Sequence, residues 1–238
     1  SQRAAAKALA LDPAQADAMG AMAILPPYFG DWGAAEARMR AVLARHPDHF
    51  PTLDALWFLH MATGAMTEGA RARIAHAAAR PLHVIHQQRL VYAYHNLGRD
   101  ADADRVADRA LTLWPKNPGL WLARLLTYVM SGRIDRAGAH FADVAGRPPL
   151  PPHVLVHCDS WLTALETRRP ADVDRVVGQV LAQFGEGPSA AILGVLHMVT
   201  VGRTDLGMAM ARAYLLEEGP LIAGVRWRPG QIAMTDQK

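Results

Sequence analysis

The sequence is poor in cysteine and in long apolar runs. Its 238 residues include one cysteine, Cys158, so no disulfide can form within the chain. The most apolar stretch, residues 190–201, is shorter than a membrane-spanning helix and is followed at once by Gly202 and Arg203. No secretory signal peptide is recognisable. We therefore predict a protein that does not insert into a membrane, and we expect a cytoplasmic location.

Concentrated positive charge is also missing. The formal net charge is +3, from 25 basic and 22 acidic residues, and the two signs are interspersed. The longest basic runs are short: Arg168-Arg169 and the pair Arg226/Arg228. A nucleic-acid-binding surface normally needs clustered lysine and arginine. We therefore predict that this chain does not bind nucleic acid directly.

The motifs of common catalytic sites are absent as well. Neither glycine-rich phosphate-binding pattern is present, nor is the HExxH zinc motif. His157 and Cys158 are adjacent rather than facing, and Ser160 lacks the context of a nucleophile elbow. We interpret Cys158 as a buried thiol that packs like a small apolar side chain. The chain is therefore predicted not to be an enzyme.

What the sequence does contain is a fixed period of 34 residues, carried by proline and, in another phase, by glycine. The prolines are Pro13, Pro47, Pro81, Pro115 and Pro149, and the glycines are Gly30, Gly64, Gly98 and Gly132. Only 16 prolines occur in the chain, so this phasing is not a result of abundance. Such a period is typical of stacked helix–turn–helix repeats, because each unit buries its apolar face on the next.

The two residue types predict where the helices end. Proline cannot continue a helix interior, so it marks the loop between repeats. Glycine adopts a left-handed conformation readily, so it marks the turn within a repeat, and we expect a further turn at Gly202. After a lone second helix at residues 1–12, the expected repeats are 16–49, 50–83, 84–117 and 118–151, then helices 153–167, 170–184, 189–201 and 204–218. Residues 219–238 form an irregular tail, and 1–218 form the array. Expected N-caps are Asp31, Thr67, Asp100 and Asp135.

The residues around these glycines resemble the tetratricopeptide repeat family. The resemblance rests on Gly30–Ala37 with Leu43 and Pro47, on Gly98–Ala110 with Leu111 and Pro115, and on Gly132, Ile134, Ala137, Phe141 and Pro149. Small residues at the family's packing positions match Ala35, Ala103 and Ala137, whereas Gly69 stands where alanine is usual. The resemblance covers about residues 4–217. It implies an all-α fold, a right-handed superhelix of antiparallel helix hairpins.

The resemblance also implies a concave groove lined mainly by the first helix of each repeat. The groove-facing positions are Asp54, Phe58, Met61, Gln88, Arg89, Tyr92, His95, Asn96, His153, His157 and Ser160. Arg89, Tyr92 and Asn96 share one helix face. We expect this face to be free for a partner, because the opposite face, through Leu90 and Tyr94, is used for packing. Arg89 and Asn96 suit a carboxylate or a backbone amide of the partner.

Eleven histidines raise the question of a metal site. His83/His86 and His153/His157 are spaced so that two imidazoles can lie on one side of a helix. No cysteine or carboxylate nearby in sequence completes either pair. We therefore interpret these histidines as structural or solvated, and we predict neither a metal nor a cofactor.

These observations favour non-catalytic binding of a protein or peptide segment in the groove. One alternative is a regulatory or sensor module of a larger bacterial regulator, for example behind a winged-helix DNA-binding domain. The chain begins within a repeat, and its alanine- and arginine-rich composition is typical of bacterial proteins of high GC content. Another alternative is a small-molecule-binding or enzymatic protein that uses the groove histidines. Histidines clustered in a deep pocket would favour that alternative.

Overall fold

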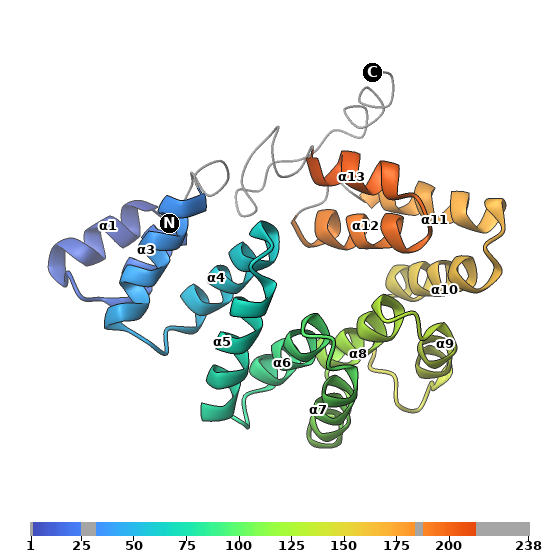
Figure 1. Cartoon of the computed structure of the whole chain (residues 1–238), viewed down its shortest axis with the longest axis horizontal. Helices are drawn as coiled ribbons and strands as arrows, with labels where there is room; N and C mark the ends of the chain where they lie inside the picture. Colours follow the sequence, from blue (N-terminus) through green and yellow to red (C-terminus); the bar gives the residue numbers. More distant parts are fainter. Residues whose placement is uncertain (1, 25–31, 184–187, 213–238) are drawn as a thin grey trace. The chain divides into compact units, whose positions relative to one another are not determined.

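The computed structural model describes residues 2–24, 32–183 and 188–212, and within them every regular element is a helix (Figure 1). The helices are α1 (Gln2–Leu11), α2 (Ala16–Ile24), α3 (Trp32–Arg45), α4 (Phe50–Thr63), α5 (Met66–Ala79), α6 (Val84–Asn96), α7 (Asp100–Leu113), α8 (Pro118–Met130), α9 (Ile134–Ala142), α10 (Pro152–Thr167), α11 (Pro170–Gln183), α12 (Pro188–Thr200) and α13 (Thr204–Arg212). The all-α prediction is confirmed for these residues, and the helix bounds follow the expected repeats closely. The predicted tail, residues 219–238, lies outside them.

The chain divides into two compact units, residues 1–114 (unit 1) and 115–238 (unit 2). The boundary falls at Pro115, one of the phased prolines, between α7 and α8. In unit 1 each helix from α1 to α7 packs against the next, and α2 also packs against α4. In unit 2 the same succession of neighbours runs from α8 to α13. Each unit is therefore a series of helix hairpins.

Glycine makes four of the turns within hairpins, as predicted, whereas the turn between α10 and α11 contains Arg168, whose φ is 53°. Gly64, Gly98, Gly132 and Gly202 have φ angles of 82°, 68°, 72° and 88°. Residues with a Cβ adopt this left-handed conformation at a cost of about 1–2 kcal/mol, which glycine avoids. Gly30, the fifth expected turn, lies outside the described residues. The phased prolines occupy the loops between hairpins, where no backbone N–H is needed.

Three of the predicted N-caps, Thr67, Asp100 and Asp135, are wrong by one or two residues. The residues at the cap positions of α5, α7 and α9 are Ala65, Arg99 and Arg133, and none of their side chains caps the helix. Asp100 and Asp135 lie inside the first turn instead, where a negative charge is favoured by the helix dipole. Asn117 is a side-chain cap that the sequence analysis did not name: its Oδ1 accepts from the backbone N–H of Leu120 at 2.9 Å. The fourth candidate, Asp31, lies outside the described residues.

Small residues bring the helices of each hairpin together. Ala103 and Ala137 are fully buried, as predicted. A Cβ at Gly69 would lie 3.0 Å from Cβ of His60 and 3.3 Å from Cδ1 of Trp57, so glycine in place of alanine lets α5 approach these two side chains of α4. The repeat pattern is therefore broken at Gly69 for a packing reason.

The packing face of α6 differs from the prediction. Its fully buried residues are His86, Val91 and Ala93. Leu90 and Tyr94, which were expected to carry the packing, are only half-buried. The buried face of α6 is therefore rotated from the one expected.

Candidate functional site

In unit 1 the residues expected in the groove form an ion-pair cluster. Asp54 of α4 accepts hydrogen bonds from Arg73 of α5 at 2.8 Å and from Arg89 of α6 at 3.0 and 3.2 Å. Only 2% of the Arg73 side chain is exposed, compared with 19% of Asp54 and 21% of Arg89. One carboxylate thus connects three consecutive helices. Arg89 is not the free donor that the sequence analysis expected.

Aromatic rings pack against both arginines. The Arg89 guanidinium lies 5.5 Å from the ring centre of Trp57 and 5.2 Å from that of Phe58, and Arg73 lies 5.2 Å from Trp57. The Tyr92 ring stacks on Trp57 at 6.5 Å. Burial raises the pKa of Tyr92 to about 12, although the charge of Arg89 acts in the opposite direction. Phe58 and Tyr92 therefore pack within unit 1.

The other α6 residues that were predicted to line the groove are also partly buried within unit 1. Nδ1 of His95 lies 2.7 Å from Oδ1 of Asp100, at the start of α7. Gln88 forms a side-chain hydrogen bond with Tyr92. Nδ2 of Asn96 is buried and has no hydrogen-bond partner among the described residues. The predicted face of α6 thus contributes mainly to packing between helices. The side chain of Met61 lies outside the described part.

Unit 2 contains a cavity of about 360 Å³. The first helices of three consecutive hairpins, α8, α10 and α12, form its walls together with α11. Its apolar lining includes Leu122, Leu125 and Leu126 from α8, Val154 and Trp161 from α10, and Leu193 from α12. Both predicted groove histidines of α10 line it as well: His153 is exposed, and His157 is half-buried. The structure therefore brings these two residues together at one site.

His157 belongs to a hydrogen-bonded chain of four side chains. Nε2 of His157 lies 3.1 Å from Nδ1 of His197 on α12, and its Nδ1 lies 3.1 Å from Oε1 of Gln179 on α11. Nε2 of Gln179 donates to Oγ of Ser160 at 3.2 Å. Burial lowers the pKa of His157, and it lowers that of His197 to about 3. Both rings are therefore neutral at physiological pH.

Trp161 fixes the position of the His197 ring. The two rings meet edge to face with their centres 4.3 Å apart, and Nε1 of Trp161 donates to Oγ1 of Thr200 at 3.0 Å. Trp161 and His197 are both buried and both line the cavity. Cys158 also lines it, and burial raises the pKa of its thiol to about 11. The prediction of a buried thiol is confirmed.

A hollow of comparable volume, about 370 Å³, lies in unit 1 between α5, α6 and α7. Its wall includes three charged side chains, Asp102, Arg105 and Arg109. Asp102 is ion-paired with Arg105, and this contact lowers the pKa of Asp102 along with the hydrogen bond from Arg99. The unit 2 cavity is the more apolar of the two and is the better candidate for a binding site.

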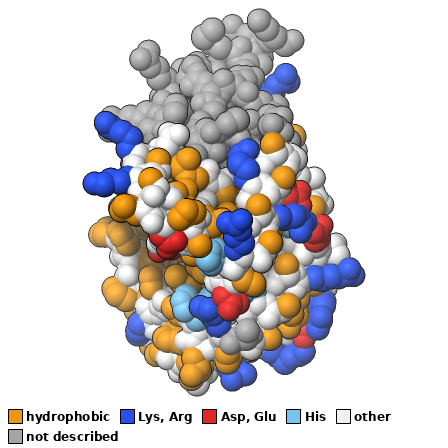
Figure 2. Space-filling view, turned by 90° about the vertical axis from the view of Figure 1, so that its left-hand side faces the viewer, with side chains coloured by type: hydrophobic (Ala, Val, Ile, Leu, Met, Phe, Trp, Pro, Cys, Tyr) orange, Lys and Arg blue, Asp and Glu red, His pale blue; other side chains and the backbone are white. Residues whose placement is uncertain are grey.

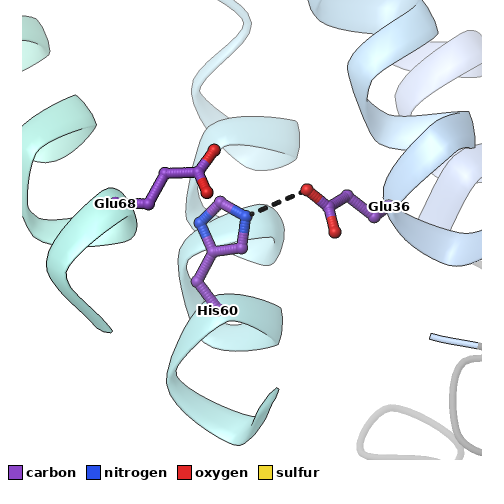
Figure 3. Close-up of side chains that lie close together, drawn as sticks. All are labelled: Glu36, His60 and Glu68. Atoms are coloured by element: carbon purple, nitrogen blue, oxygen red, sulfur yellow. Dashed lines mark hydrogen bonds and ion pairs between the residues drawn. The ribbon is translucent and has the colours of Figure 1, made fainter. Parts of the chain in front are cut away.

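One group of side chains in the described part has the convergence of a metal site: Glu36 of α3, His60 of α4 and Glu68 of α5 (Figure 3). Nε2 of His60 donates to Oε1 of Glu36 at 3.3 Å. The guanidinium of Arg40 lies 2.6 Å from Glu36 and 2.5 Å from Glu68, so it bridges the two carboxylates. The hydrogen bond from Arg40 lowers the pKa of Glu36. This cluster already contains a cation, and we interpret it as an ion-pair network between helices.

A second group of histidines lies where α5 meets α6. The ring of His86 stacks on His76 at 4.6 Å and meets His83 edge-on at 4.3 Å. His86 is fully buried, and neither of its ring nitrogens has a hydrogen-bond partner among the described residues. Burial lowers its pKa to about 4. His86 therefore acts as a neutral packing residue.

On the face displayed in Figure 2, lysine and arginine side chains alternate with apolar and acidic ones. Within the described part of the chain, none of the helices combines the length and the apolar character that crossing a membrane requires.

Comparison with known proteins gives a limited result. No protein-family model matches the chain, and no curated protein matches it. Among solved structures, a similar chain is the crystal structure of a tetratricopeptide repeat protein from Parabacteroides merdae. The two are 14% identical with a TM-score of 0.40, over 87% of this chain and 81% of that one. The conclusions below therefore rest on this chain's own helices and side chains.

Proposed function

We propose that this chain is a non-catalytic binding module that takes up an aromatic side chain of a protein segment in the cavity of unit 2. The observation that carries the proposal is the cavity itself. At about 360 Å³, with mostly apolar walls and a few polar groups, it has the size and composition of ligand sites in proteins. An aromatic side chain gains most from such walls, because it buries a large apolar area.

The ionisable groups of the cavity favour binding over catalysis. A general acid or base works best with a pKa near the working pH, and a cysteine nucleophile must be a thiolate. The pKa of His197 is about 3 and that of the Cys158 thiol is about 11. Both groups are therefore neutral, and neither is prepared to transfer a proton or attack a substrate at neutral pH.

The position of the cavity favours a protein segment as its occupant. Three successive first helices, α8, α10 and α12, contribute to its walls. A chain laid across these helices meets each of them in turn, as ligands of helical repeat proteins do. An aromatic side chain in the cavity would then be the anchor, since a few buried aromatic contacts supply most of the affinity in protein interfaces.

A free small molecule is the second candidate, and two observations favour it. The cavity volume lies within the range of small-molecule sites. The half-buried His157 and the buried His197 also place polar groups on the wall of the cavity. This candidate corresponds to the sensor or small-molecule alternative drawn from the sequence.

Selection of peptides tests the proposal. The 238-residue chain is immobilised and panned against a random peptide library, and the affinities of enriched peptides are measured for two variants of α10. Val154→Trp fills the cavity, whereas Val156→Trp makes the same change at an exposed position that does not line it. We expect enriched peptides to share an aromatic residue, to lose at least tenfold in affinity for Val154→Trp, and to bind Val156→Trp like the wild type.

Two results would contradict the proposal. Peptides that bind Val154→Trp and the wild type equally would place the site elsewhere. The second result combines two findings: no peptide is enriched, and a free aromatic compound binds tightly to the wild type but not to Val154→Trp. It would show that the ligand is a small molecule rather than a protein segment.

A further inference from the structure

In the hydrogen-bonded chain beside the cavity each side chain donates to the next one. The orientation of the Gln179 amide determines which way this donation runs. Gln179 places its Nε2 toward Ser160 and its Oε1 toward His157. An amide oxygen can only accept, so Nδ1 of His157 must carry the hydrogen. A neutral imidazole has one N–H, and Nε2 of His157 therefore accepts.

The same reasoning applies to the ring of His197. Nε2 of His157 faces Nδ1 of His197 at 3.1 Å, so Nδ1 of His197 must donate. Two protonated rings would place N–H groups against each other at this distance, which excludes a doubly charged pair. The other nitrogen of His197, Nε2, then carries a lone pair. Within the part of the chain that the structure describes, the one hydrogen bond of the His197 ring is the bond through Nδ1.

This lone pair is on the one ring nitrogen of His157 and His197 that is left to accept a hydrogen bond from an occupant. His197 lines the cavity, and its ring is held edge to face against Trp161. The neighbouring walls are leucine side chains, which offer no hydrogen bond. Of the other polar lining side chains, His157 already uses both ring nitrogens, whereas His153 lies in the first turn of α10 and Gln183 is the last residue of α11.

We infer that the cavity selects an aromatic group that carries one neutral hydrogen-bond donor, such as a phenol hydroxyl, and that Nε2 of His197 accepts its hydrogen bond. This inference rests on the proposed function and adds the chemistry of the anchor: tyrosine rather than phenylalanine. A carboxylate or phosphate would meet the lone pair with one of its own. A cationic donor would lose its hydration against apolar walls.

Burial makes the selection strong. A site that presents a buried polar group discriminates against a ligand that leaves the group unpaired, because that group has lost its contact with water. His197 is 7% exposed, so an apolar occupant would cover its Nε2 without replacing the lost hydrogen bond. His157 and Gln179 act as positioning residues, since they touch His197 or its neighbour and fix which nitrogen bears the hydrogen.

Three small probes test the inference on the full chain. They are 4-ethylphenol, which has a donor; 4-ethylanisole, in which a methyl group replaces that hydrogen; and ethylbenzene, which has no polar atom. Each fits the volume of the cavity, since a cavity of about 150 Å³ already binds benzene. Affinities are measured by calorimetry or ligand-observed NMR. We expect 4-ethylphenol to bind at least tenfold more tightly than either of the others.

Two variants assign the preference to the histidine chain. His197→Phe keeps a ring but removes the acceptor, and Gln179→Leu removes the group that sets the direction. Both should reduce the preference for 4-ethylphenol over 4-ethylanisole toward one, while ethylbenzene still binds. Val156→Trp, exposed and outside the lining, should keep the wild-type preference. Because the three probes are compared first on the wild type, the test does not depend on either variant being folded.

The outcomes separate this inference from the proposed function. Equal affinities of the wild type for all three probes would overturn the inference and leave the cavity as a binding site. Tighter binding of 4-ethylanisole would also overturn it, because His197 would then present an N–H. If none of the probes binds, the cavity is not a site for an aromatic group, and both the inference and the proposed function fail.

Discussion

Replacing Asp54 by asparagine should destabilise unit 1 more than replacing Arg89, one of the two arginines that it binds, by methionine. Asp54 is the shared partner of Arg73 and Arg89, whose side chains are 2% and 21% exposed. Without the carboxylate, two guanidinium groups remain close together with no counter-charge from Asp54. Burial already lowers the pKa of Arg73, and the charge of Arg89 lowers it further, while Asp54 opposes both effects.

The expected loss of unfolding free energy follows from the exposure of Asp54, Arg73 and Arg89. Breaking a buried ion pair on one side typically costs about 3–5 kcal/mol. Asp54 is 19% exposed, so water screens part of this effect, and we expect a loss of roughly 2–4 kcal/mol. Arg89→Met leaves Asp54 and Arg73 as a one-to-one pair, so its loss should be smaller, about 1–2 kcal/mol.

Urea unfolding followed by circular dichroism at pH 7 measures these differences. The control is Asp48→Asn, because Asp48 is 70% exposed and lies 3.6 Å from Arg80, and exposed pairs contribute less than about 1 kcal/mol. The midpoints should fall in the order Asp48→Asn, Arg89→Met, Asp54→Asn, from highest to lowest, at a constant slope. Equal midpoints for Asp54→Asn and Asp48→Asn would show that the cluster does not hold α4, α5 and α6 together.

Three further predictions follow from other sites. Ala103→Leu should destabilise the protein by about 1–3 kcal/mol through overpacking, whereas the exposed neighbour Ala101→Leu should change little; equal urea midpoints would show that the helix register is wrong. The pKa of His86 is lowered from 6.5 to about 4 in the folded protein. As the pH falls, His86 is therefore protonated in the unfolded chain before it is protonated in the folded one. The stability that neutral His86 contributes is therefore complete above pH 6.5 and is lost as the pH falls toward 4, at up to about 1.4 kcal/mol per pH unit. His86→Leu should flatten the pH dependence of the unfolding free energy, and an unchanged slope would contradict this. Chelator should leave the melting temperature of the wild type unchanged, whereas zinc should raise that of Arg40→Met, because the bridging cation is then missing; stabilisation of the wild type by zinc would show that Arg40 does not exclude the metal.

The sequence predicts the helices well because their ends depend on local chemistry. Gly64 and Gly98 lie where a left-handed residue is required, and this requirement can be read from a single residue type and its phase. The N-caps were missed because the helices begin up to two residues earlier than the acidic side chains suggested. Such shifts of one or two residues depend on the exact backbone path rather than on residue type.

The candidate site was predicted only in part, because it depends on contacts between repeats. Asp54 and Arg89 stand 35 residues apart, one more than the period, and the position equivalent to Asp54 in the next repeat is Gln88. Repeat phase alone therefore does not predict their pairing. His157 was named, but its partner His197 lies 40 residues later on α12, at a position that the 34-residue period does not match to it. Gln179 carries no sequence signal of its own, and its role depends on the packing of α11 against α10.

The central claim is that the cavity of unit 2 binds an aromatic group. Methyl NMR of the full chain during titration with 4-ethylphenol tests it most directly. Saturable shifts should be confined to methyl groups that line the cavity, such as those of Leu125, Val154 and Leu193, while Leu53 and Leu56 of unit 1 stay unchanged. Shifts concentrated on Leu53 and Leu56, or none at a saturating concentration, would contradict the claim.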